Sequence, residues 1–259
     1  MALQDDITPL LITFDEIRNI ARTLGRLGWA KRIVVVDSGS TDGTLEFLAG
    51  DQRVEVHHRP FDSFAEQCNF GLSLIRTEWV LSLDADYELS DELTADLAAL
   101  RPATDEAGFR ARFIYRIHGR PLRGTLYPPR TVLYRVRGAR YDNEGHGHRI
   151  RVQGKVSTLG GVIFHDDRKP LARWFAAQSK YAAIEAIHLL KAQPSELSFV
   201  DRVRRWGWPA PFLVVAYVLI VKRALLDGRA GWFYAFQRLC AEVLLALELL
   251  DRRLSARTP

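Results

Sequence analysis

The chain has 259 residues, of which 47% are hydrophobic and 26% charged, and its formal charge is +5 at pH 7. This apolar content is enough to bury a core and excludes an intrinsically disordered chain. Its two cysteines, Cys68 and Cys240, lie far apart without metal-type spacing, which argues against a disulfide framework and a cysteine-based zinc site.

The first ninety residues alternate strand-like and helix-like segments. Three short, mainly apolar runs have the composition of strands, 10–14, 32–36 and 79–83, and 54–57 is predicted to be a further strand. Three segments between them carry apolar side chains at helical spacing: 15–27, 44–49 and 64–75. This alternation predicts a doubly wound α/β sheet, in which ligands bind beyond the carboxyl ends of the strands.

The pattern changes after residue 108. Shorter alternating pieces between 109 and 165 predict an antiparallel part that contacts a second ligand, and 171–190 predicts a helix. We therefore expect a nucleotide-binding α/β half at 1–108 and an acceptor-side half of the same domain at 109–200, followed by a basic amphipathic tail at 201–259.

Acidic side chains follow three of the predicted strands. Asp15 and Glu16 follow the first, Asp37 ends the second, and Asp84 and Asp86 follow the fourth. Side chains at i and i+2 of an extended chain point the same way, so the last two carboxylates can face one Mg²⁺ or Mn²⁺ ion or one sugar nucleotide. The alternative is that these aspartates only cap a helix and shape a turn.

Several stretches together point to one family. VVVDSGSTDGT at 34–44 places an aspartate at a strand end before a run of hydroxyls and backbone donors, although alone it also fits an ordinary strand-to-helix turn. With WVLSLDAD, FAEQCNFGL and DGRAGWFYAFQR, it resembles the family 2 inverting glycosyltransferases of the Rossmann-like A-type fold. The resemblance is strongest to the small bacterial enzymes of the lipopolysaccharide-core glucosyltransferase type.

This resemblance implies a nucleotide-diphosphate sugar as donor, with uridine as the expected base. The residues that it places around the donor are Thr13, Glu16, Asp37, Ser38, Ser40, Gln67, Asn69 and Asp84. It implies that Asp86 binds the metal ion and the diphosphate. Many relatives carry a lysine between the equivalents of Gln67 and Asn69, where this chain has Cys68. Any phosphate contact of that lysine has to come from elsewhere here or be absent.

Inversion at an anomeric carbon requires one general base, which takes the proton of the attacking hydroxyl. The candidates lie in YDNEGHGHRI at 141–150. Glu144 comes first because a carboxylate is the usual base in the family, followed by Asp142, His146 and His148. Related enzymes commonly show His-Glu near this point, so the choice among the four stays open. The alternative for this stretch is a polar hairpin loop.

Two further residues complete the predicted site. His165, at the end of the apolar run VIFH, is a candidate third metal ligand beside Asp84 and Asp86, a role that some relatives give to a late histidine; the alternative is a structural histidine. Arg130, in YPPRTVLYR, faces either the diphosphate or an anionic acceptor, or is an exposed arginine without such a task.

The C-terminal tail holds the whole positive surplus, because residues 201–259 contain ten Lys/Arg against five Asp/Glu, which leaves 26 of each sign before them. Residues 206–221 carry no charge. A spanning helix needs about 20 apolar residues, so this run, with its tryptophans and flanking arginines, favours an anchor lying in the membrane interface. The alternative is a pair of buried helices.

The sequence thus predicts a metal-dependent inverting hexosyltransferase acting on a lipid-linked or lipopolysaccharide acceptor. The N-terminus has no basic segment followed by an apolar run, so we expect a cytoplasmic protein, peripheral on the inner membrane. Nucleic acid is not expected as a partner, since no DNA- or RNA-binding module is recognisable. Alternatives are a sugar nucleotidyltransferase, although LITFDEIRNI lacks a Gly-rich phosphate loop, and a non-catalytic, membrane-associated nucleotide-sugar-binding protein.

Overall fold

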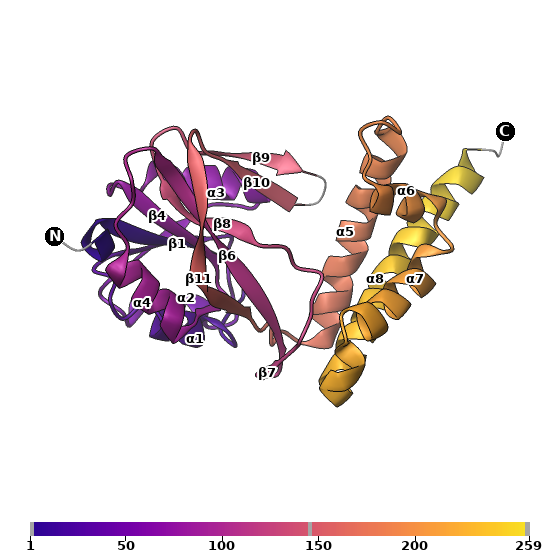
Figure 1. Cartoon of the computed structure of the whole chain (residues 1–259), viewed down its shortest axis with the longest axis horizontal. Helices are drawn as coiled ribbons and strands as arrows, with labels where there is room; N and C mark the ends of the chain where they lie inside the picture. Colours follow the sequence, from indigo (N-terminus) through magenta and orange to yellow (C-terminus); the bar gives the residue numbers. More distant parts are fainter. Residues whose placement is uncertain (1–2, 145–146, 257–259) are drawn as a thin grey trace. The chain divides into compact units, whose positions relative to one another are not determined.

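The computed structural model describes residues 3–144 and 147–256, which form two compact units (Figure 1). We call Met1–Gly119 with Tyr127–Arg168 the sheet unit, and Arg120–Leu126 with Lys169–Pro259 the helical unit. The sheet unit contains the mixed sheet and the helices that cover it, whereas the helical unit consists almost entirely of helices. The functional division into 1–108, 109–200 and 201–259 stays a prediction, because the two units are defined by how residues pack and not by function.

Four parallel strands form the first half of the sheet in the spatial order β3-β2-β1-β4. Their bounds are β1 Ile7–Thr13, β2 Ile33–Asp37, β3 Val54–His58 and β4 Trp79–Asp84. The helices between them are α1 Ile20–Gly25, α2 Thr44–Ala49 and α3 Phe64–Ser73, and a short 3₁₀ turn, η1 Leu3–Asp6, precedes β1. This arrangement confirms the predicted α/β fold. Every residue of β2 is buried, as expected for a parallel strand covered on both faces.

The register of these strands brings the acidic strand ends together. Thr13 of β1 lies opposite Asp37 of β2, and Ile12 lies opposite Asp84 of β4. Helix α1 begins five residues later than predicted, because the backbone N–H groups of Asp15 and Glu16 donate to hydroxyls of the β2–α2 loop instead of starting a helix. The segment between β1 and α1 therefore lies beside the segment after β2.

The second half of the sheet continues in the order β4-β8-β6-β11-β5. Its strands are β5 Tyr87–Leu89, β6 Glu106–Ile117, β8 Arg130–Arg135 and β11 Lys155–His165, with α4 Asp91–Ala99 between β5 and β6. Pairing is antiparallel except between β6 and β11, which are parallel. The expectation of a wholly antiparallel part was wrong at this point, because β8 and a separate hairpin intervene in the chain and no tight turn joins β6 to β11.

The separate hairpin consists of β9 Arg140–Glu144 and β10 Gly147–Arg151 and is the only sheet in the described residues outside the main one. It packs on α3, to which it is fastened by Asn69. After β4, the chain turns at Ala85 and Asp86 and continues into β5, where Tyr87 lies opposite His165 of β11. The end of β11 is thereby placed next to the Asp84–Asp86 turn.

The helical unit contains four α-helices and three short elements. The α-helices are α5 Leu171–Lys191, α6 Phe199–Trp206, α7 Ala210–Ala216 and α8 Gly228–Ser255. The short elements are β7 Arg120–Pro121, the π-helical turn η2 Tyr217–Val221 and the 3₁₀ turn η3 Ala224–Asp227. Arg204 of α6 lies between Glu185 and Glu242, at 2.9 and 3.1 Å, and so links α5 to α8 by buried ion pairs. In the described part of the chain, no helix has the length and hydrophobicity to cross a membrane.

Candidate functional site

The carboxylate of Asp37 organises the loop that follows β2. It is fully buried, and its oxygens accept hydrogen bonds from Thr13 Oγ1 at 2.9 Å, from the backbone N–H groups of Gly39 and Ser40 at 2.8 Å each, and from the Ser40 hydroxyl. Gly39 adopts φ +100°, a conformation that favours glycine. The backbone N–H of Ser38 donates to Thr13 O at 3.1 Å. Four of the predicted donor residues therefore meet here, with Asp37 fixing the loop conformation.

The loop after β1 is tied to this β2 loop. The backbone N–H of Asp15 donates to Ser40 Oγ at 2.7 Å, and that of Glu16 donates to Thr44 Oγ1 at 2.7 Å. The Glu16 side chain is 6% exposed, and its carboxylate accepts from Asn19 Nδ2 at 2.8 Å. These contacts make the two predicted nucleoside loops one connected structure.

Two predicted donor residues on α3 hold neighbouring backbone. Gln67 Nε2 donates to the carbonyls of Arg59 and Pro60 at 2.9 and 3.0 Å. Asn69 forms a reciprocal pair with Tyr141, donating to its carbonyl at 3.0 Å and accepting from its N–H at 2.8 Å. Asn69 thus fixes the β9–β10 hairpin, a task that the sequence did not indicate. The role of both side chains in the nucleotide pocket stays a prediction.

A cavity of about 430 Å³ opens beside the end of β4. Its lining includes three of the predicted site residues, Asp84, Arg130 and His148, together with Cys68. The other residues that line it are Ser82, Leu83, Tyr87, Arg110, Phe113, Pro128, Pro129, Thr131, Val132, Tyr141, Arg149 and Ile150. Aromatic and proline side chains from the second half of the sheet thus face a single carboxylate and several arginines.

Arg130 is the cation of this cavity that the sequence singled out. Its guanidinium carbon lies 4.5 Å from the centre of the Tyr127 ring, a cation–π geometry. Burial opposes its charge, but Tyr127, Tyr87 and Asp84 together raise the pKa of Arg130 above its ordinary value. Burial raises the pKa of the Cys68 thiol. Cys68, which stands where many relatives have a lysine, is therefore uncharged. Arg130 supplies a positive charge in the lining of the same cavity.

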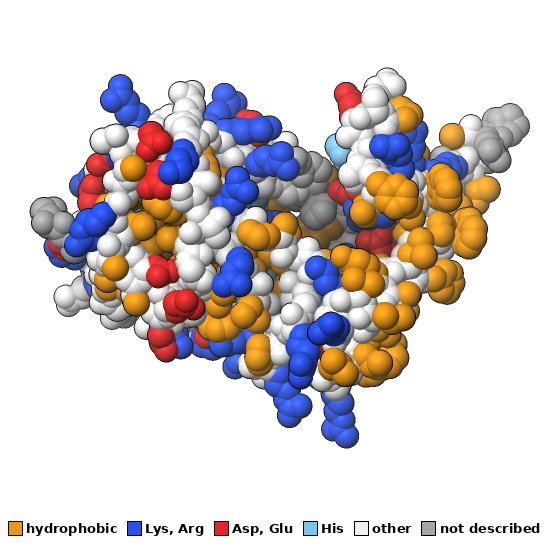
Figure 2. Space-filling model, in the orientation of Figure 1, with side chains coloured by type: hydrophobic (Ala, Val, Ile, Leu, Met, Phe, Trp, Pro, Cys, Tyr) orange, Lys and Arg blue, Asp and Glu red, His pale blue; other side chains and the backbone are white. Residues whose placement is uncertain are grey.

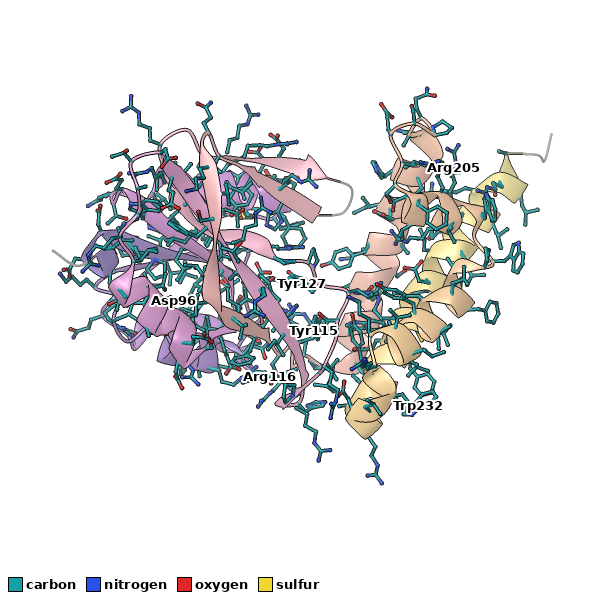
Figure 3. The ribbon with its side chains drawn as sticks, viewed as in Figure 1. Asp96, Tyr115, Arg116, Tyr127, Arg205 and Trp232 are labelled. Carbon is teal, nitrogen blue, oxygen red and sulfur yellow. The ribbon has the colours of Figure 1, made fainter. Side chains whose placement is uncertain are left out.

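Asp86 forms a buried pair with His165. Asp86 Oδ2 lies 3.1 Å from His165 Nε2, and the two side chains are 8% and 13% exposed. The imidazole packs among three tyrosine rings, Tyr87, Tyr115 and Tyr127, at centroid distances of 5.1, 4.4 and 5.3 Å. Figure 3 labels Tyr115 and Tyr127. Burial alone would lower the pKa of His165, but the carboxylates of Asp86 and Asp84 outweigh it and raise the pKa.

Asp84 and Asp86 lie two residues apart at the turn after β4. Asp84 lines the cavity, whereas Asp86 is not among the described residues that line it and pairs with His165. Burial and, after it, the carboxylates of Asp84 and Asp86 raise the pKa of Tyr87 and Tyr127. Within residues 3–144 and 147–256, no three His, Cys, Asp or Glu side chains are grouped to hold a metal by themselves. The binding of a divalent cation by Asp84, Asp86 and His165 stays a prediction.

His148 is the described base candidate that lines the cavity. Its ring packs against Tyr141 and Phe64, with centroids 5.1 and 5.7 Å away. Burial and the charge of Arg130 lower the pKa of His148, Asp84 raises it, and the net direction is downward from 6.5. The imidazole is therefore neutral near pH 7 and can accept a proton.

The other three base candidates are placed differently. Asp142 is half exposed, accepts from Arg151 Nε at 3.1 Å and has Arg140 Nε at 3.7 Å, and it is not among the described residues that line the cavity. Glu144 ends β9, but its side chain lies outside the described part of the structure, as does His146. Of the two candidates whose side chains the structure describes, His148 lines the cavity and Asp142 does not.

The family model described as Glycosyl transferase family 2 matches residues 10–152, more than half of the chain. The chain belongs to glycosyl transferase family 2. This family 2 glycosyltransferase is 34% identical over 254 residues to an uncharacterized glycosyltransferase, RC0292, of Rickettsia conorii, covering 92% of this chain and 90% of the relative. The predicted family is confirmed.

This family 2 glycosyltransferase is also similar to two proteins whose names are more specific. The lipopolysaccharide core biosynthesis glycosyltransferase LpsC of Rhizobium meliloti is 28% identical over 195 residues, covering 70% of each chain. The crystal structure of residues 1–349 of S. aureus TarS in complex with UDP-GlcNAc aligns over 96% of this chain and 92% of that chain, with a TM-score of 0.48 and 15% identity.

Proposed function

We propose that this enzyme moves a sugar, with inversion, from a uridine diphosphate sugar to a lipid-linked or lipopolysaccharide acceptor of the cell envelope. The observation that carries the proposal is the Asp84–Asp86 turn at the end of β4, which places the Asp84 carboxylate in the lining of a cavity and next to the loops after β1 and β2, with the Asp86 carboxylate two residues further on. The likeness to a lipopolysaccharide core glycosyltransferase over 70% of the chain supports this acceptor class.

On the donor side, we place the nucleoside at the joined β1 and β2 loops and the diphosphate at Asp86. A Mg²⁺ or Mn²⁺ ion held by Asp86 and Asp84, together with diphosphate oxygens and water, would neutralise charge on the departing diphosphate. His165, the predicted third ligand, pairs with Asp86 and does not form a three-residue ligand group with the two aspartates in the described residues. Arg130 adds a permanently charged guanidinium beside the same cavity. It is the described residue best suited to meet the phosphate charge that Cys68, as a neutral thiol, leaves uncompensated.

On the acceptor side, we propose His148 as the general base, with Glu144 as the second choice. The neutral imidazole takes the proton of the acceptor hydroxyl, the oxygen forms a bond to the anomeric carbon, and the bond from that carbon to the diphosphate oxygen breaks. A base on one face and a departing diphosphate on the other produce inversion. Tyr87, Phe113 and Pro129 give the cavity the apolar surfaces on which sugar rings pack.

Binding of uridine nucleotides is the first expected result. In thermal-shift measurements, UDP and UDP-sugars should raise the melting temperature, and Mn²⁺ should increase the shift, because a ligand that binds only the folded state stabilises it by RT ln(1 + [L]/Kd). A purine nucleotide that shifts the melting temperature more than UDP would overturn the choice of base. Turnover that depends on pyrophosphate would favour a nucleotidyltransferase, and binding without transfer would favour a non-catalytic protein.

We further propose that the helical unit lies on the inner membrane surface. Figure 2 shows hydrophobic side chains gathered over this unit, with lysines and arginines beside them. Its most exposed apolar side chains are Phe199, Val200, Trp206, Trp208, Phe212, Ile220, Val221, Leu226 and Leu254, each at least 61% exposed. Aromatic side chains next to arginines match an interfacial anchor on anionic headgroups. The alternative of fully buried helices does not account for this exposure.

The membrane proposal predicts binding to anionic vesicles. The protein should sediment with vesicles that contain phosphatidylglycerol and should release as salt rises. Replacing Trp208 and Phe212, both 71% exposed, by serine should weaken binding at least about tenfold, since burying each ring contributes roughly 1.5–3 kcal/mol. Phe47→Ser, at a 42% exposed phenylalanine of the sheet unit, is the matched control. Equal sedimentation of the double variant and the wild type would refute the proposal.

A further inference from the structure

A buried carboxylate lies directly behind the Asp84–Asp86 turn and has no part in the mechanism above. Asp166 follows His165 and is fully buried. Its Oδ2 accepts from Arg22 Nη1 at 3.1 Å, from the Gly119 N–H at 2.9 Å and from Arg168 Nη2 at 2.7 Å. Its own N–H donates to the carbonyl of Asp86 at 3.3 Å. Asp166 therefore connects the end of β11 to the turn that carries Asp86.

Two consecutive residues of helix α1 contact the turn and the residues beside it. Thr23 Oγ1 donates to the carbonyl of Ala85, the middle residue of the turn, at 2.7 Å. Arg22 Nη2 donates to the carbonyl of Asp166 at 2.8 Å, and its Nη1 pairs with both Glu88 and Asp166. Glu88 is only 8% exposed, so this guanidinium neutralises two carboxylates that are shielded from water.

Further contacts extend this network on both sides. Arg116 of β6, labelled in Figure 3, pairs with Glu88 at 3.4 Å and lies over the Phe164 ring. On the other side, Arg22 Nη2 donates to Asn19 Oδ1 at 2.6 Å, and Asn19 Nδ2 donates to Glu16 at 2.8 Å. The loop after β1 and the turn after β4 are thus joined by one chain of hydrogen bonds through α1.

We propose that Arg22 and Thr23 are positioning residues, which hold the Asp84–Asp86 turn against the end of β11 so that Asp86 stays opposite His165. Two carboxylates only two residues apart in a tight turn repel each other, and a turn fastened only by its own backbone would relieve this by opening. The hydroxyl of Thr23 and the guanidinium of Arg22 oppose that opening. The inference rests on the proposed function, because it concerns the readiness of Asp86 to meet the cation and the diphosphate.

The test uses substitutions that remove these contacts with little change in volume or charge. Thr23→Val removes the donor to Ala85, and Arg22→Lys keeps the positive charge but loses the forked geometry that reaches four acceptor atoms on Glu88, Asp166 and Asn19. Thr94→Val and Arg53→Lys are matched controls in the same unit: Thr94 donates to the carbonyl of Ser90 at 3.2 Å, and Arg53 bonds Asp51 and the carbonyl of Leu27. Thermal denaturation of each protein establishes that it is folded.

The readout is the affinity for Mn²⁺ at saturating UDP, measured from the free-Mn²⁺ electron paramagnetic resonance signal. Residues that orient metal ligands typically change metal affinity 10- to 100-fold, so we expect about tenfold weaker binding in Arg22→Lys and a smaller loss in Thr23→Val. The controls should bind as the wild type does. Wild-type affinity in both folded variants would overturn the inference. Failure of the wild type itself to bind Mn²⁺ with UDP would instead overturn the proposed function.

Discussion

Replacing Asp86 by asparagine is expected to lower kcat about 10²–10³-fold while the protein stays folded, a loss of roughly 2.7–4 kcal/mol of transition-state stabilisation. The substitution keeps the shape of the side chain and removes the charge that faces His165 and, in our proposal, the cation at the diphosphate. Release of UDP from a UDP-sugar, followed with saturating Mn²⁺, measures the effect. Asp84→Asn should also lower activity, because Asp84 lines the cavity beside the end of β4.

The control for this prediction is Asp91→Asn. Asp91 carries the same charge but its side chain is 92% exposed in the first turn of α4, so its loss should leave kcat within about twofold. If Asp86→Asn were as active as Asp91→Asn, the two carboxylates would have only a structural role in the turn. The interpretation of Asp84 and Asp86 as a helix cap and turn would then be preferred.

His148→Gln should lower kcat about 10²–10⁴-fold, the usual contribution of a positioned general base. The amide can keep a polar contact in the cavity but cannot accept a proton. His188→Gln, at an exposed histidine near the end of α5, is the matched control and should be silent. The product anomer, determined by NMR, should be inverted relative to the donor in the wild type.

The pH dependence of kcat/KM gives an independent test of the same residue. Burial and Arg130 lower the pKa of His148, so the imidazole is neutral above a value that lies below 6.5. Activity should therefore be present at neutral pH and fall as the pH drops through that value. The residual activity of His148→Gln should lack this acid limb. An unchanged limb in His148→Gln, with its loss in Glu144→Gln, would make Glu144 the base.

The first half of the fold could be predicted from the sequence because its signals are local. The run at 33–36 is apolar throughout, as a strand covered on both faces requires, and the aspartates at 37, 84 and 86 follow such runs. Parallel strands carry these ends to one edge of the sheet, so the meeting of Thr13, Asp37 and Ser40 follows from the topology.

The remainder depends on contacts between distant residues, which no local pattern records. Arg22 meets Asp166 across 144 positions, and Asn69 meets Tyr141 across 72. The three tyrosines around His165 come from distant parts of the chain: Tyr87 from β5, Tyr115 from β6, and Tyr127 from the loop before β8. Likewise, the choice of His148 over Asp142 depends on which side of the hairpin faces the cavity, and that is decided by how the hairpin packs on α3.

The most direct test of the account is the position of Mn²⁺ in crystals grown with UDP and Mn²⁺, located by anomalous scattering at the manganese edge. One strong peak is expected within coordination distance of Asp86, about 2.0–2.3 Å from a carboxylate oxygen, with the diphosphate oxygens as further ligands. Bound UDP with no manganese at Asp86, or manganese bound elsewhere on the sheet unit, would contradict it.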